Sequence, residues 1–487
     1  MILIIDIGTS SLRAALMDET GEALHAEQRK YSVQMLENGG VQMDLALLDQ
    51  ALDDALDATG QWLRSEGRHV QMISVTAQRS SVIPVDRQGA ALAQALMWQD
   101  RRAAGICRDL KDRESELFQI CGLRLSPVFS APKMRLLQQM LPSVFDEAYK
   151  LIGFQEYVLC RLCGELVTDE TIASRTCLYD LKNQVWSDRS LQLFGLPKEK
   201  LCRLVPAGSV IGVTRPNITR LLGEEHPVQV LSAGGDQQCA ALGQGAATPG
   251  SLAVNSGTGA YVVALIDKVF IDPQMRVNCN AAATPQHWIL EGSVLSAGRT
   301  VEWFYRTFFP QSQDRYPYEQ LENLLEDSVC GAHQLLFRNA LTGIGTPDWE
   351  PQERASFLGV SAHHTLSDFS RAVFEGIAAD VAGCVELLQT LTPNPCRTIR
   401  CAGGLTRFEL YNQILSDMLG LPVERALNPE ATGRGAWISA ATALGWFASH
   451  AQACDAFSIP LKRYEPDAQR HALYLEQRQR LKALTEH

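Results

Sequence analysis

The sequence contains no Gly-Lys dipeptide, which excludes the P-loop because that phosphate-binding motif ends in Gly-Lys. It also lacks the H-E-x-x-H pattern of zinc peptidases and the G-x-S-x-G turn of serine hydrolases. Cys160 and Cys163 have C-x-x-C spacing, but no second pair accompanies them and they lie in a helical pattern. His363 and His364 have no acidic or thiol neighbours, so neither pair predicts a metal site.

An excess of basic residues is also missing. The net charge of −11 argues against a nucleic-acid surface, which needs clustered cations to replace the counterions of phosphate. No basic segment precedes the first apolar run, and the apolar stretch 436–448 is too short to span a bilayer. The 13 cysteines are scattered singly, as in reduced proteins. We therefore expect a cytoplasmic protein that binds neither nucleic acid nor membrane.

The chain has 487 residues, which predicts two domains of ~200–250 residues each. Periodicity predicts strands at 2–5, 12–17, 72–76, 228–231, 251–256, 260–266 and 397–401. It predicts helices at 45–63, 133–140, 149–164, 366–391, 411–419 and 433–450, with loop-rich connectors at 168–180 and 193–212. Mixed strands and helices in this proportion indicate an α/β fold.

One supersecondary pattern occurs twice. A strand, a Gly-Thr turn and a second strand begin the chain around Asp6–Ser10. The same layout recurs around Ser256–Gly259, where the second Gly-Thr lies 249 positions after the first. Repetition at half the chain length predicts two related domains, each beginning with a hairpin. Backbone N–H groups in such turns suit phosphate, so facing hairpins would clamp a polyphosphate between the domains. Arg13 would reach this phosphate, and the Asp6 carboxylate suits Mg²⁺ held through water.

The central segment 231–245 contains the candidate catalytic acid. Gly234 and Gly235 allow a tight turn with positive φ, and Asp236 follows them at the start of a predicted helix, beside Gln237. A carboxylate held on such a turn can accept a proton. The alternative is that Asp236 only caps the helix, as aspartate often does.

Polar clusters at two predicted strand ends suggest a place for a small polar ligand. They are Ala77–Ser81, which includes Gln78 and Arg79, and Met97–Arg102, which includes Trp98 and Asp100. Solvated surface turns would give the same pattern, because charged clusters are usually exposed. Gly298 before a helix and the pair Gly403-Gly404 after a strand leave room for a flat ligand such as a base or ribose, although a structural turn also explains the pair.

Taken together and in order, these segments resemble the FGGY family of carbohydrate kinases. The similarity runs from Ile2 to about Ala448, and it is carried by Asp6–Asp18, Trp98–Arg102, Val167–Thr176, Gly234–Gln238, Ser256–Gly259, Gly343–Trp349 and Ala402–Gly404. The resemblance implies an N-terminal domain at 1–244 and a C-terminal domain at 245–450, with a peripheral tail at 451–487. It further implies that both domains are actin-like, of the ribonuclease H type, around a central catalytic cleft.

The resemblance also implies roles for individual residues. Asp236 would be the general base, and Asp6 would support Mg²⁺ beside it. The acceptor would be held by Gln78, Arg79, Trp98, Asp100, Asp236 and Gln237. The nucleotide would be held by Thr9, Ser10, Arg13, Gly257, Thr258, Gly298, Glu302, Gly403 and Gly404. The implied activity is ATP-dependent and Mg²⁺-dependent phosphorylation of a sugar or polyol hydroxyl.

Departures from the family pattern bear on the substrate. Where this chain has Ala77–Ser81, glycerol kinases have a segment that resembles N-Q-R-E-T. Ser80 therefore replaces the acid that binds the hydroxyls of glycerol. Glu302 stands where glycerol kinases have Gln, and Phe408 where they have Asn near adenine. We expect a ketopentose acceptor such as xylulose or ribulose. The alternatives are an autoinducer-2, glycerol or tetritol kinase, a non-catalytic actin-like ATP switch, and a hydrolase using Asp6 and Asp236. A homodimer is one option for its assembly.

Overall fold

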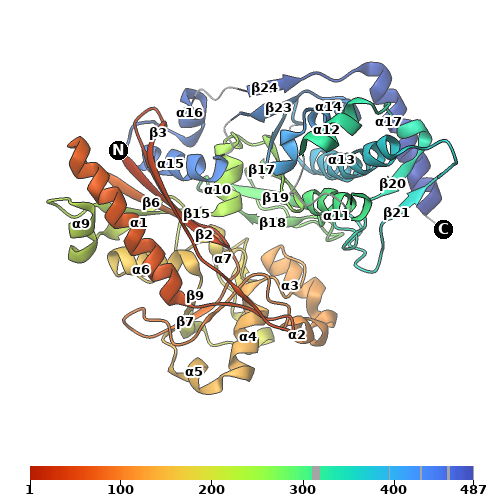
Figure 1. Ribbon diagram of the computed structural model, residues 1–487. Coiled ribbons are helices and arrows are strands. Elements are labelled where there is room, and N and C mark those ends of the chain that lie inside the picture. The colour runs from red at the N-terminus through yellow and green to blue at the C-terminus, as the bar shows by residue number, and fades with distance from the viewer. Residues whose placement is uncertain (310–317, 394, 428–429, 458–460, 486–487) are drawn as a thin grey trace. The chain divides into compact units, whose positions relative to one another are not determined.

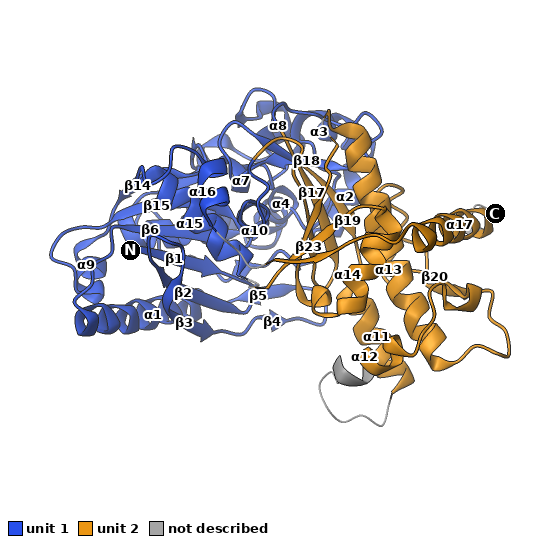
Figure 2. Ribbon diagram, turned by 90° about the horizontal axis from the view of Figure 1, so that it is seen from above, with its two compact units in different colours: residues 1–247, 267–289, 430–458 blue, residues 248–266, 290–429, 459–487 orange. Residues whose placement is uncertain are grey.

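The computed structural model describes residues 1–309, 318–393, 395–427, 430–457 and 461–485. The chain divides into two compact units (Figure 2). Unit 1 comprises residues 1–247, 267–289 and 430–458, and unit 2 comprises residues 248–266, 290–429 and 459–487. Both units are therefore assembled from segments that are far apart in the sequence.

The sheet of unit 1 has the strand order β14-β15-β6-β1-β2-β3. Its strands are β1 (Ile2–Ile7), β2 (Ser11–Met17), β3 (Ala23–Lys30), β6 (Met72–Ala77), β14 (Ser209–Val213) and β15 (Gln229–Gly235). The strand β6 runs parallel to both β1 and β15, and the other neighbours are antiparallel. Ala77 at the end of β6 pairs with Ile7 on one side and with Gly235 on the other. The carboxyl ends of the three parallel strands therefore coincide at one edge of the sheet.

Helices cover both faces of this sheet (Figure 1). Because side chains alternate along a strand, Leu3 and Ile5 of β1 pack into one core and Ile2 and Ile4 into another. The first core contains α1 (Leu45–Glu66), α6 (Phe154–Cys163) and α9 (Pro216–Leu222), and the second contains α10 (Asp236–Gly243) and α15 (Ala431–Ala443). The result is a three-layer α/β/α arrangement.

The helices α10 and α15 touch through glycines. A Cβ added at Gly243 would lie 1.9 Å from the carbonyl oxygen of Ala431, and one added at Gly435 would lie 1.9 Å from that of Cys239. No side chain fits at either position without separating the two helices. Since α10 begins at Asp236, the packing of α15 supports the turn that carries this acid.

Gly435→Ala is expected to destabilise unit 1 by about 3 kcal/mol, because overpacking against backbone forces helices apart. Gly433→Ala is the matched control on the same helix, since its Cβ would only meet Ile4 Cγ2 at 4.0 Å. Alanine is favoured over glycine in helices by about 1 kcal/mol, so the control should be neutral or stabilising. Differential scanning calorimetry compares the two variants. Equal transition midpoints would contradict the proposed close packing.

Six of the seven strands of the second sheet repeat this topology, with the order β19-β17-β16-β22-β23-β24. These strands are β16 (Leu252–Ser256), β17 (Ala260–Ile266), β19 (Trp288–Val294), β22 (Ile399–Ala402), β23 (Val423–Ala426) and β24 (Leu461–Tyr464). An antiparallel hairpin, β16-β17, is again followed by two parallel strands and an antiparallel edge strand. The long helix α13 (Leu366–Leu391) packs against α14 (Glu409–Leu419) and β17. The prediction of two related α/β domains is confirmed.

The remaining elements range from two-residue strands to the 18-residue helix α17. In unit 1 they are β4 (Gln34–Met35), β5 (Val41–Met43), β7 (Ile83–Val85), β8 (Ala95–Leu96), α2 (Ala104–Asp109), α3 (Glu114–Cys121), α4 (Ser130–Met140), α5 (Pro142–Glu147), β9 (Lys150–Ile152), β10 (Val167–Asp169), α7 (Glu170–Ala173), β11 (Tyr179–Asp180), β12 (Val185–Trp186), α8 (Asp188–Phe194), β13 (Arg203–Val205), β18 (Asn278–Ala281) and α16 (His450–Ala456). In unit 2 they are α11 (Gly298–Phe308), α12 (Tyr318–Glu326), β20 (Leu336–Arg338), β21 (Ser356–Leu358) and α17 (Ala468–Thr485). The helix expected at 149–164 is thus interrupted, because Gly153 separates β9 from α6.

Two features differ from the expected domain boundaries. The segment 430–458 belongs to unit 1 rather than to the C-terminal unit, because α15 packs on α10. The segment 459–487 is not a peripheral tail. Its strand β24 pairs with β23, and Tyr474 of α17 is fully buried and donates a hydrogen bond of 2.8 Å to Glu375 Oε1.

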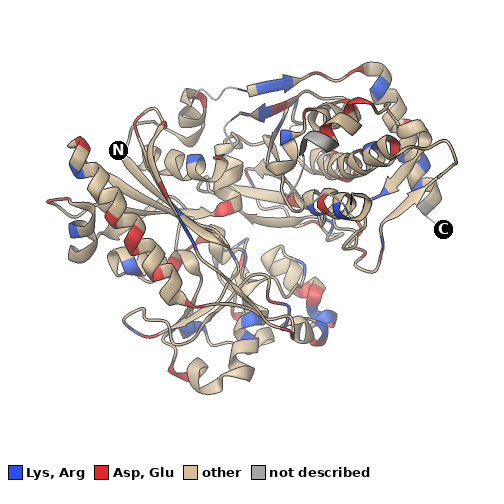
Figure 3. Ribbon diagram, in the orientation of Figure 1, with Lys and Arg blue, Asp and Glu red and all other residues tan. Residues whose placement is uncertain are grey.

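Composition and structure agree on the character of the surface and of the cysteines. Figure 3 shows Lys and Arg interspersed with Asp and Glu along the ribbon. All 13 cysteines are free thiols. Among the described residues, no helix is both long and apolar enough to cross a bilayer.

Candidate functional site

The common edge of the three parallel strands of unit 1 collects the predicted acids. Asp6 lies in β1 one residue from its end, Gln78 follows β6, and Asp236 follows β15. Because Ile7, Ala77 and Gly235 are in register, these side chains emerge near one another. This convergence comes from parallel pairing, which brings together positions far apart in the sequence.

Asp236 lies at the first residue of α10, after a turn that only glycine fits. Gly234 has a φ of +120°, and a Cβ added at Gly235 would lie 2.6 Å from Arg79 Cδ. The Asp236 carboxylate accepts a hydrogen bond of 2.7 Å from the backbone amide of Gln237, while the N-cap position of α10 is occupied by Gly235. The carboxylate also pairs with Arg79, whose Nε lies 3.3 Å from Asp236 Oδ1. Capping alone therefore does not account for its surroundings.

Arg79 is fixed from a second side, since its Nη1 donates a hydrogen bond of 3.1 Å to Gln238 Oε1. The Arg79 side chain is 9% exposed, whereas that of Asp236 is 27% exposed. A largely buried guanidinium therefore orients a carboxylate that solvent or a substrate can still reach. This is the arrangement expected of a positioned proton acceptor.

Asp6 has an unusual electrostatic environment. Burial, together with repulsion from Asp236 and Glu430, raises the pKa of its carboxyl to about 7, against a lowering by Arg13. Arg13 lies directly across the β1-β2 hairpin from Asp6 and forms an ion pair with Glu430. Two carboxylates that repel each other at one strand edge form a place where a cation is stabilising.

The residues fit a shared Mg²⁺ rather than an all-protein metal centre. In nucleotide-dependent enzymes Mg²⁺ keeps several waters and takes one or two carboxylates together with substrate phosphates. The described residues contain no group of three or more His, Cys, Asp or Glu that could hold a metal. Asp6 and Asp236 offer the smaller donor set, and a cation near both would relieve their repulsion.

The first hairpin turn is held by side chains from several elements. Gly8 N donates to Ser11 O at 2.9 Å and closes the turn. The Gly8 carbonyl accepts from Gln78 Nε2 at 3.0 Å and from Tyr31 Oη at 2.7 Å. Sequence reasoning missed Tyr31, which follows β3 and offered no motif.

Trp98 approaches the same turn, because its indole Nε1 donates to Thr9 Oγ1 at 3.1 Å. Ser10 beside it is exposed. Within the described residues, Gln78 Oε1 and Ser81 Oγ are buried and have no hydrogen-bond partner. Buried polar atoms are rarely left unpaired, so these two suit a ligand that carries hydroxyl groups.

Asp100 is surrounded by hydrogen-bond donors. It is fully buried, and its carboxylate accepts hydrogen bonds from Val41 N at 3.1 Å and from Arg102 Nη2 at 2.6 Å. Arg102 N and Nε donate to the same group. With these donors already in place, Asp100 holds the turn after Trp98 onto β5, and its binding to the acceptor stays a prediction.

In unit 2 the predicted nucleotide residues surround the second hairpin. The carbonyl of Gly257 accepts from Gly298 N at 2.9 Å, and that of Thr258 accepts from Ala297 N at 2.9 Å. A Cβ at Gly298 would lie 2.6 Å from the Gly257 carbonyl oxygen. Gly298 is therefore required for this backbone contact, independently of any ligand, while Thr258 is exposed at the tip.

The other glycines of unit 2 divide into two kinds. Gly403 has a φ of +100°, and a Cβ there would lie 2.5 Å from Ser256 O, so the fold itself requires glycine. Gly404 has no atom within 4 Å of an added Cβ, which leaves the open space expected beside a ligand. Glu302 pairs with Arg306 at 2.6 Å, and Phe408 is 2% exposed, so its ring does not face a ligand.

The structure thus groups the predicted residues within each unit. Unit 1 contains Asp6, Thr9, Ser10, Arg13, Gln78, Arg79, Trp98, Asp100, Asp236 and Gln237, and unit 2 contains Gly257, Thr258, Gly298, Glu302, Gly403 and Gly404. Gln237 contributes its backbone amide, which donates to Asp236 Oδ1.

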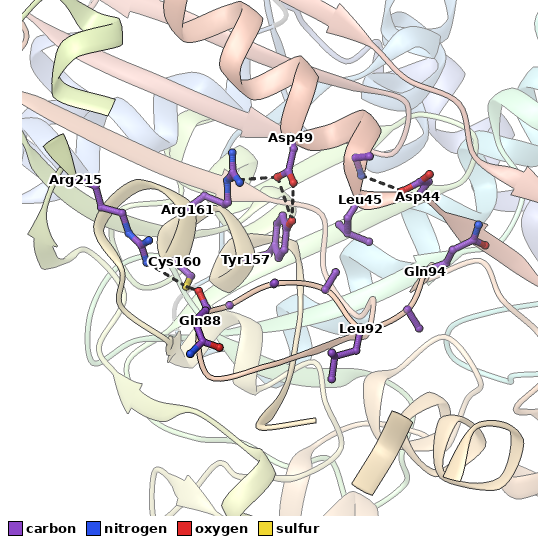
Figure 4. Close-up of a pocket in the computed structure, with 15 residues that line it drawn as sticks. Asp44, Leu45, Asp49, Gln88, Leu92, Gln94, Tyr157, Cys160, Arg161 and Arg215 are labelled. Carbon is purple, nitrogen blue, oxygen red and sulfur yellow. Dashed lines mark hydrogen bonds and ion pairs between the residues drawn. The ribbon is translucent and has the colours of Figure 1, made fainter. Parts of the chain in front are cut away.

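A pocket of about 540 Å³ lies elsewhere in unit 1, between α1, α6 and the segment 88–94 (Figure 4). Its lining, all within the described chain, includes none of the predicted site residues. Arg161 pairs with Asp49 at 3.4 Å, and Asp49 also accepts from Tyr157 Oη. Because these polar groups pair with one another, the pocket does not compete with the strand edge as the candidate site.

Comparison with known proteins identifies relatives over most of the chain. The N-terminal and C-terminal domain models of the FGGY family of carbohydrate kinases match residues 1–243 and 252–444. Glycerol kinase from Synechocystis is 30% identical over 461 residues, which cover 91% of this chain and 91% of that protein. Xylulose kinase from Staphylococcus epidermidis is 26% identical and covers 97% and 94%, respectively.

Solved structures extend the similarity to the fold. Ligand-bound xylulose kinase from Lactobacillus acidophilus has a TM-score of 0.92 at 24% identity, over 99% of this chain and 98% of that one. Glycerol kinase from Plasmodium falciparum with ADP has a TM-score of 0.90 at 22% identity, over 100% and 99%. These neighbours confirm the predicted actin-like two-domain fold.

Proposed function

Because the chain belongs to the FGGY family of carbohydrate kinases, and so is a phosphotransferase acting on sugar or polyol hydroxyls, we propose that its acceptor is a ketopentose and that Asp236 is its general base. The family's phosphoryl donor is ATP, in line with the ADP named for the Plasmodium falciparum structure. The observation that carries the residue assignment is the Arg79–Asp236 pair at 3.3 Å, beside Asp6 at the common strand edge.

Phosphoryl transfer depends on positioning and charge neutralisation more than on covalent chemistry. Asp236 takes the proton of the acceptor hydroxyl, and the freed oxygen forms a bond to the γ-phosphorus of ATP. The bond between that phosphorus and the β–γ bridging oxygen breaks, and ADP leaves. Arg79 holds the carboxylate in place, and Gln78, Trp98 and the Gln237 segment bind the acceptor.

The remaining predicted residues bind the nucleotide. Thr9, Ser10 and Arg13 contact phosphate in unit 1, as do Gly257 and Thr258 in unit 2, while Gly298, Glu302, Gly403 and Gly404 lie on the adenosine side. Asp6 and Asp236 would hold Mg²⁺, directly or through water, and the ion would supply charge neutralisation there. The free thiols and acidic composition support a cytoplasmic location.

The acceptor proposal rests on Ser80. Glycerol kinases have an acid here, whereas Ser80 is 5% exposed and donates a hydrogen bond of 3.3 Å to the carbonyl of Arg175. A short hydroxyl cannot grip a ligand hydroxyl as a carboxylate does, because charge-assisted hydrogen bonds are about twice as strong as neutral ones. A longer acceptor with more hydroxyls compensates for this lost contact.

An ADP-release assay with different acceptors tests the proposal. We expect kcat/KM for xylulose or ribulose to exceed that for glycerol, gluconate, a tetritol, a ketohexose and autoinducer-2 precursor by about tenfold or more. A difference of this size corresponds to one strong polar contact. A higher kcat/KM for any other acceptor would make that compound, rather than a ketopentose, the substrate. ADP release without an acceptor would indicate the hydrolase, and nucleotide binding without release would indicate the ATP switch.

Ser80→Glu should shift the preference towards glycerol. Restoring the carboxylate is expected to raise the ratio of kcat/KM for glycerol to that for the ketopentose by about tenfold, the value of one charge-assisted hydrogen bond. Ser80→Gln is the control, because it has the same size without the charge. An unchanged ratio in Ser80→Glu would show that position 80 does not select the acceptor.

A further inference from the structure

The peptide group between Gly234 and Gly235, one residue before Asp236, is hydrogen-bonded on both sides. The carbonyl oxygen of Gly234 accepts a hydrogen bond of 2.8 Å from Thr76 Oγ1 on β6. The amide of Gly235, which belongs to the same peptide plane, donates one of 2.8 Å to Thr171 Oγ1 on α7. The glycines have no side chains that would fix this plane, so the two threonine hydroxyls hold it together with the pairing of β15 with β6 and a contact of 3.7 Å from Cys239 Sγ to the Gly234 carbonyl.

Thr171 is itself oriented by Asp169. Its hydroxyl donates a hydrogen bond of 2.5 Å to Asp169 Oδ1, which also accepts from the amides of Thr171 and Ile172. A hydroxyl has only one hydrogen, and here it is committed to the carboxylate. The lone pairs of Thr171 Oγ1 are therefore left facing the amide of Gly235.

A second set of hydrogen bonds leads to the Asp169 carboxylate from β15 and α6. Ser232 Oγ donates to Asp169 Oδ2 at 2.6 Å and accepts from Gln155 Nε2 at 2.9 Å. Gln155 also donates to the carbonyl of Val75 on β6 at 3.2 Å. The carboxylate thus ties α6, α7 and β15 together directly behind the turn, where α7 packs on β15 (Figure 1).

Burial makes this network directional. Gln155 and Asp169 are 1% exposed, and Thr171 and Ser232 are 0% exposed. A carboxylate accepts hydrogen bonds and donates none, so every neighbouring hydroxyl must point its hydrogen towards Asp169. The hydroxyls and the carboxylate of this network are paired with one another, whereas Gln155 Oε1 is buried without a hydrogen-bond partner among the described residues. Turning either hydroxyl away would leave the buried carboxylate with one donor fewer.

We propose that Asp169 and Thr171 are positioning residues that fix the Gly234–Gly235 peptide and thereby aim the Asp236 carboxylate at the acceptor hydroxyl. This proposal rests on the proposed role of Asp236 as the base. Neither residue touches the substrate. Their effect is on the geometry of proton transfer, where a displacement of about 1 Å far from the chemistry can cost a hundredfold in rate.

Thr171→Val removes the hydroxyl and keeps the branched shape, whereas Thr171→Ser keeps the hydroxyl. We expect Thr171→Val to lower kcat about tenfold with KM for ATP unchanged, and Thr171→Ser to stay within about threefold of wild type. Thr59→Val is the matched control, because Thr59 is also 0% exposed and bonds only to the Ala55 carbonyl in the contacts described for α1. It should leave kcat unchanged.

A double-mutant cycle connects the effect to Asp236. If Thr171 acts through Asp236, then Thr171→Val should not slow Asp236→Asn further, because the base it aims is already gone. A tenfold loss in both backgrounds would overturn the positioning role, and so would equal kcat for Thr171→Val and Thr171→Ser. Should Asp236→Asn itself remain active, the base assignment fails, whatever Thr171→Val does.

Folding is monitored by circular dichroism and by calorimetric binding of ADP. If Thr171→Val does not fold, Ser232→Ala provides the second test, since it removes one donor to Asp169 and leaves Gln155 bonded to the Val75 carbonyl. We expect Ser232→Ala to lower kcat about threefold to tenfold with KM for ATP unchanged. A wild-type kcat in the folded Ser232→Ala protein would overturn the proposal.

Discussion

Asp236→Asn is expected to lower kcat about a thousandfold, within the range that general-base catalysis contributes, while the Kd for ATP stays within about twofold of wild type. The amide has the shape of the carboxylate but cannot accept the proton of the acceptor hydroxyl. It also loses the ionic part of the contact with Arg79 at 3.3 Å. Steady-state kinetics and titration calorimetry measure the two quantities separately.

The control for Asp236→Asn is Asp53→Asn in the same unit. Asp53 has a side chain 48% exposed and pairs with Arg161 on the far helix layer, so its neutralisation should leave kcat unchanged. If Asp236→Asn keeps more than about a tenth of the wild-type kcat, the barrier has risen by less than roughly 1.4 kcal/mol, and Asp236 is not the base.

Asp6→Asn is expected to lower kcat about a hundredfold and yet to raise stability at pH 8. Its loss of activity follows from weaker Mg²⁺ binding through water, since such supporting ligands are worth 10- to 100-fold. The gain follows because burial and repulsion from Asp236 raise the pKa of Asp6 to about 7, from an ordinary value of 3.8. Ionised Asp6 therefore destabilises the folded protein, and asparagine removes that charge.

The sign of the pH dependence is specific. Between pH 3.8 and about 7 the unfolded chain loses the Asp6 proton while the folded protein keeps it, so wild-type stability falls as pH rises. Above pH 7 the ionised Asp6 lowers the free energy of unfolding by a constant amount. This amount is on the order of 2 kcal/mol once residual solvation of the carboxylate is allowed for. Thermal melts in EDTA should show Asp6→Asn above wild type at pH 8 and level with it at pH 4. A constant difference across this range would contradict the raised pKa.

Much of the candidate site follows from local chemistry in the sequence. A Gly-Gly pair before Asp236 predicts a tight turn, and the observed φ of +120° at Gly234 agrees. The repeated Gly-Thr hairpins predict two related sheets, and the strand order recurs in both units. Such features are readable because they depend on residues close together in the chain.

Features that depend on distant segments were not predictable in the same way. The sequence predicts that Asp100 binds the acceptor but does not reveal that the fold turns Arg102 back onto it and places Val41 N beside it. The segment 168–180 looked like a connector, although Asp169 and Thr171 bind Ser232 and Gly235 more than 60 residues away. Tertiary contacts of this kind leave no periodic signal in the sequence.

The discontinuity of unit 1 has a consequence for synthesis on the ribosome. Helix α10, which begins at Asp236, is covered by α15, whose residues 431–443 are translated after residues 248–266 and 290–429 of unit 2. Domains generally fold in the order in which they emerge, at about 5–20 residues per second. The α10 glycine face therefore stays uncovered throughout the synthesis of residues 248–429, and unit 1 completes its fold only after residues 431–443 have left the exit tunnel.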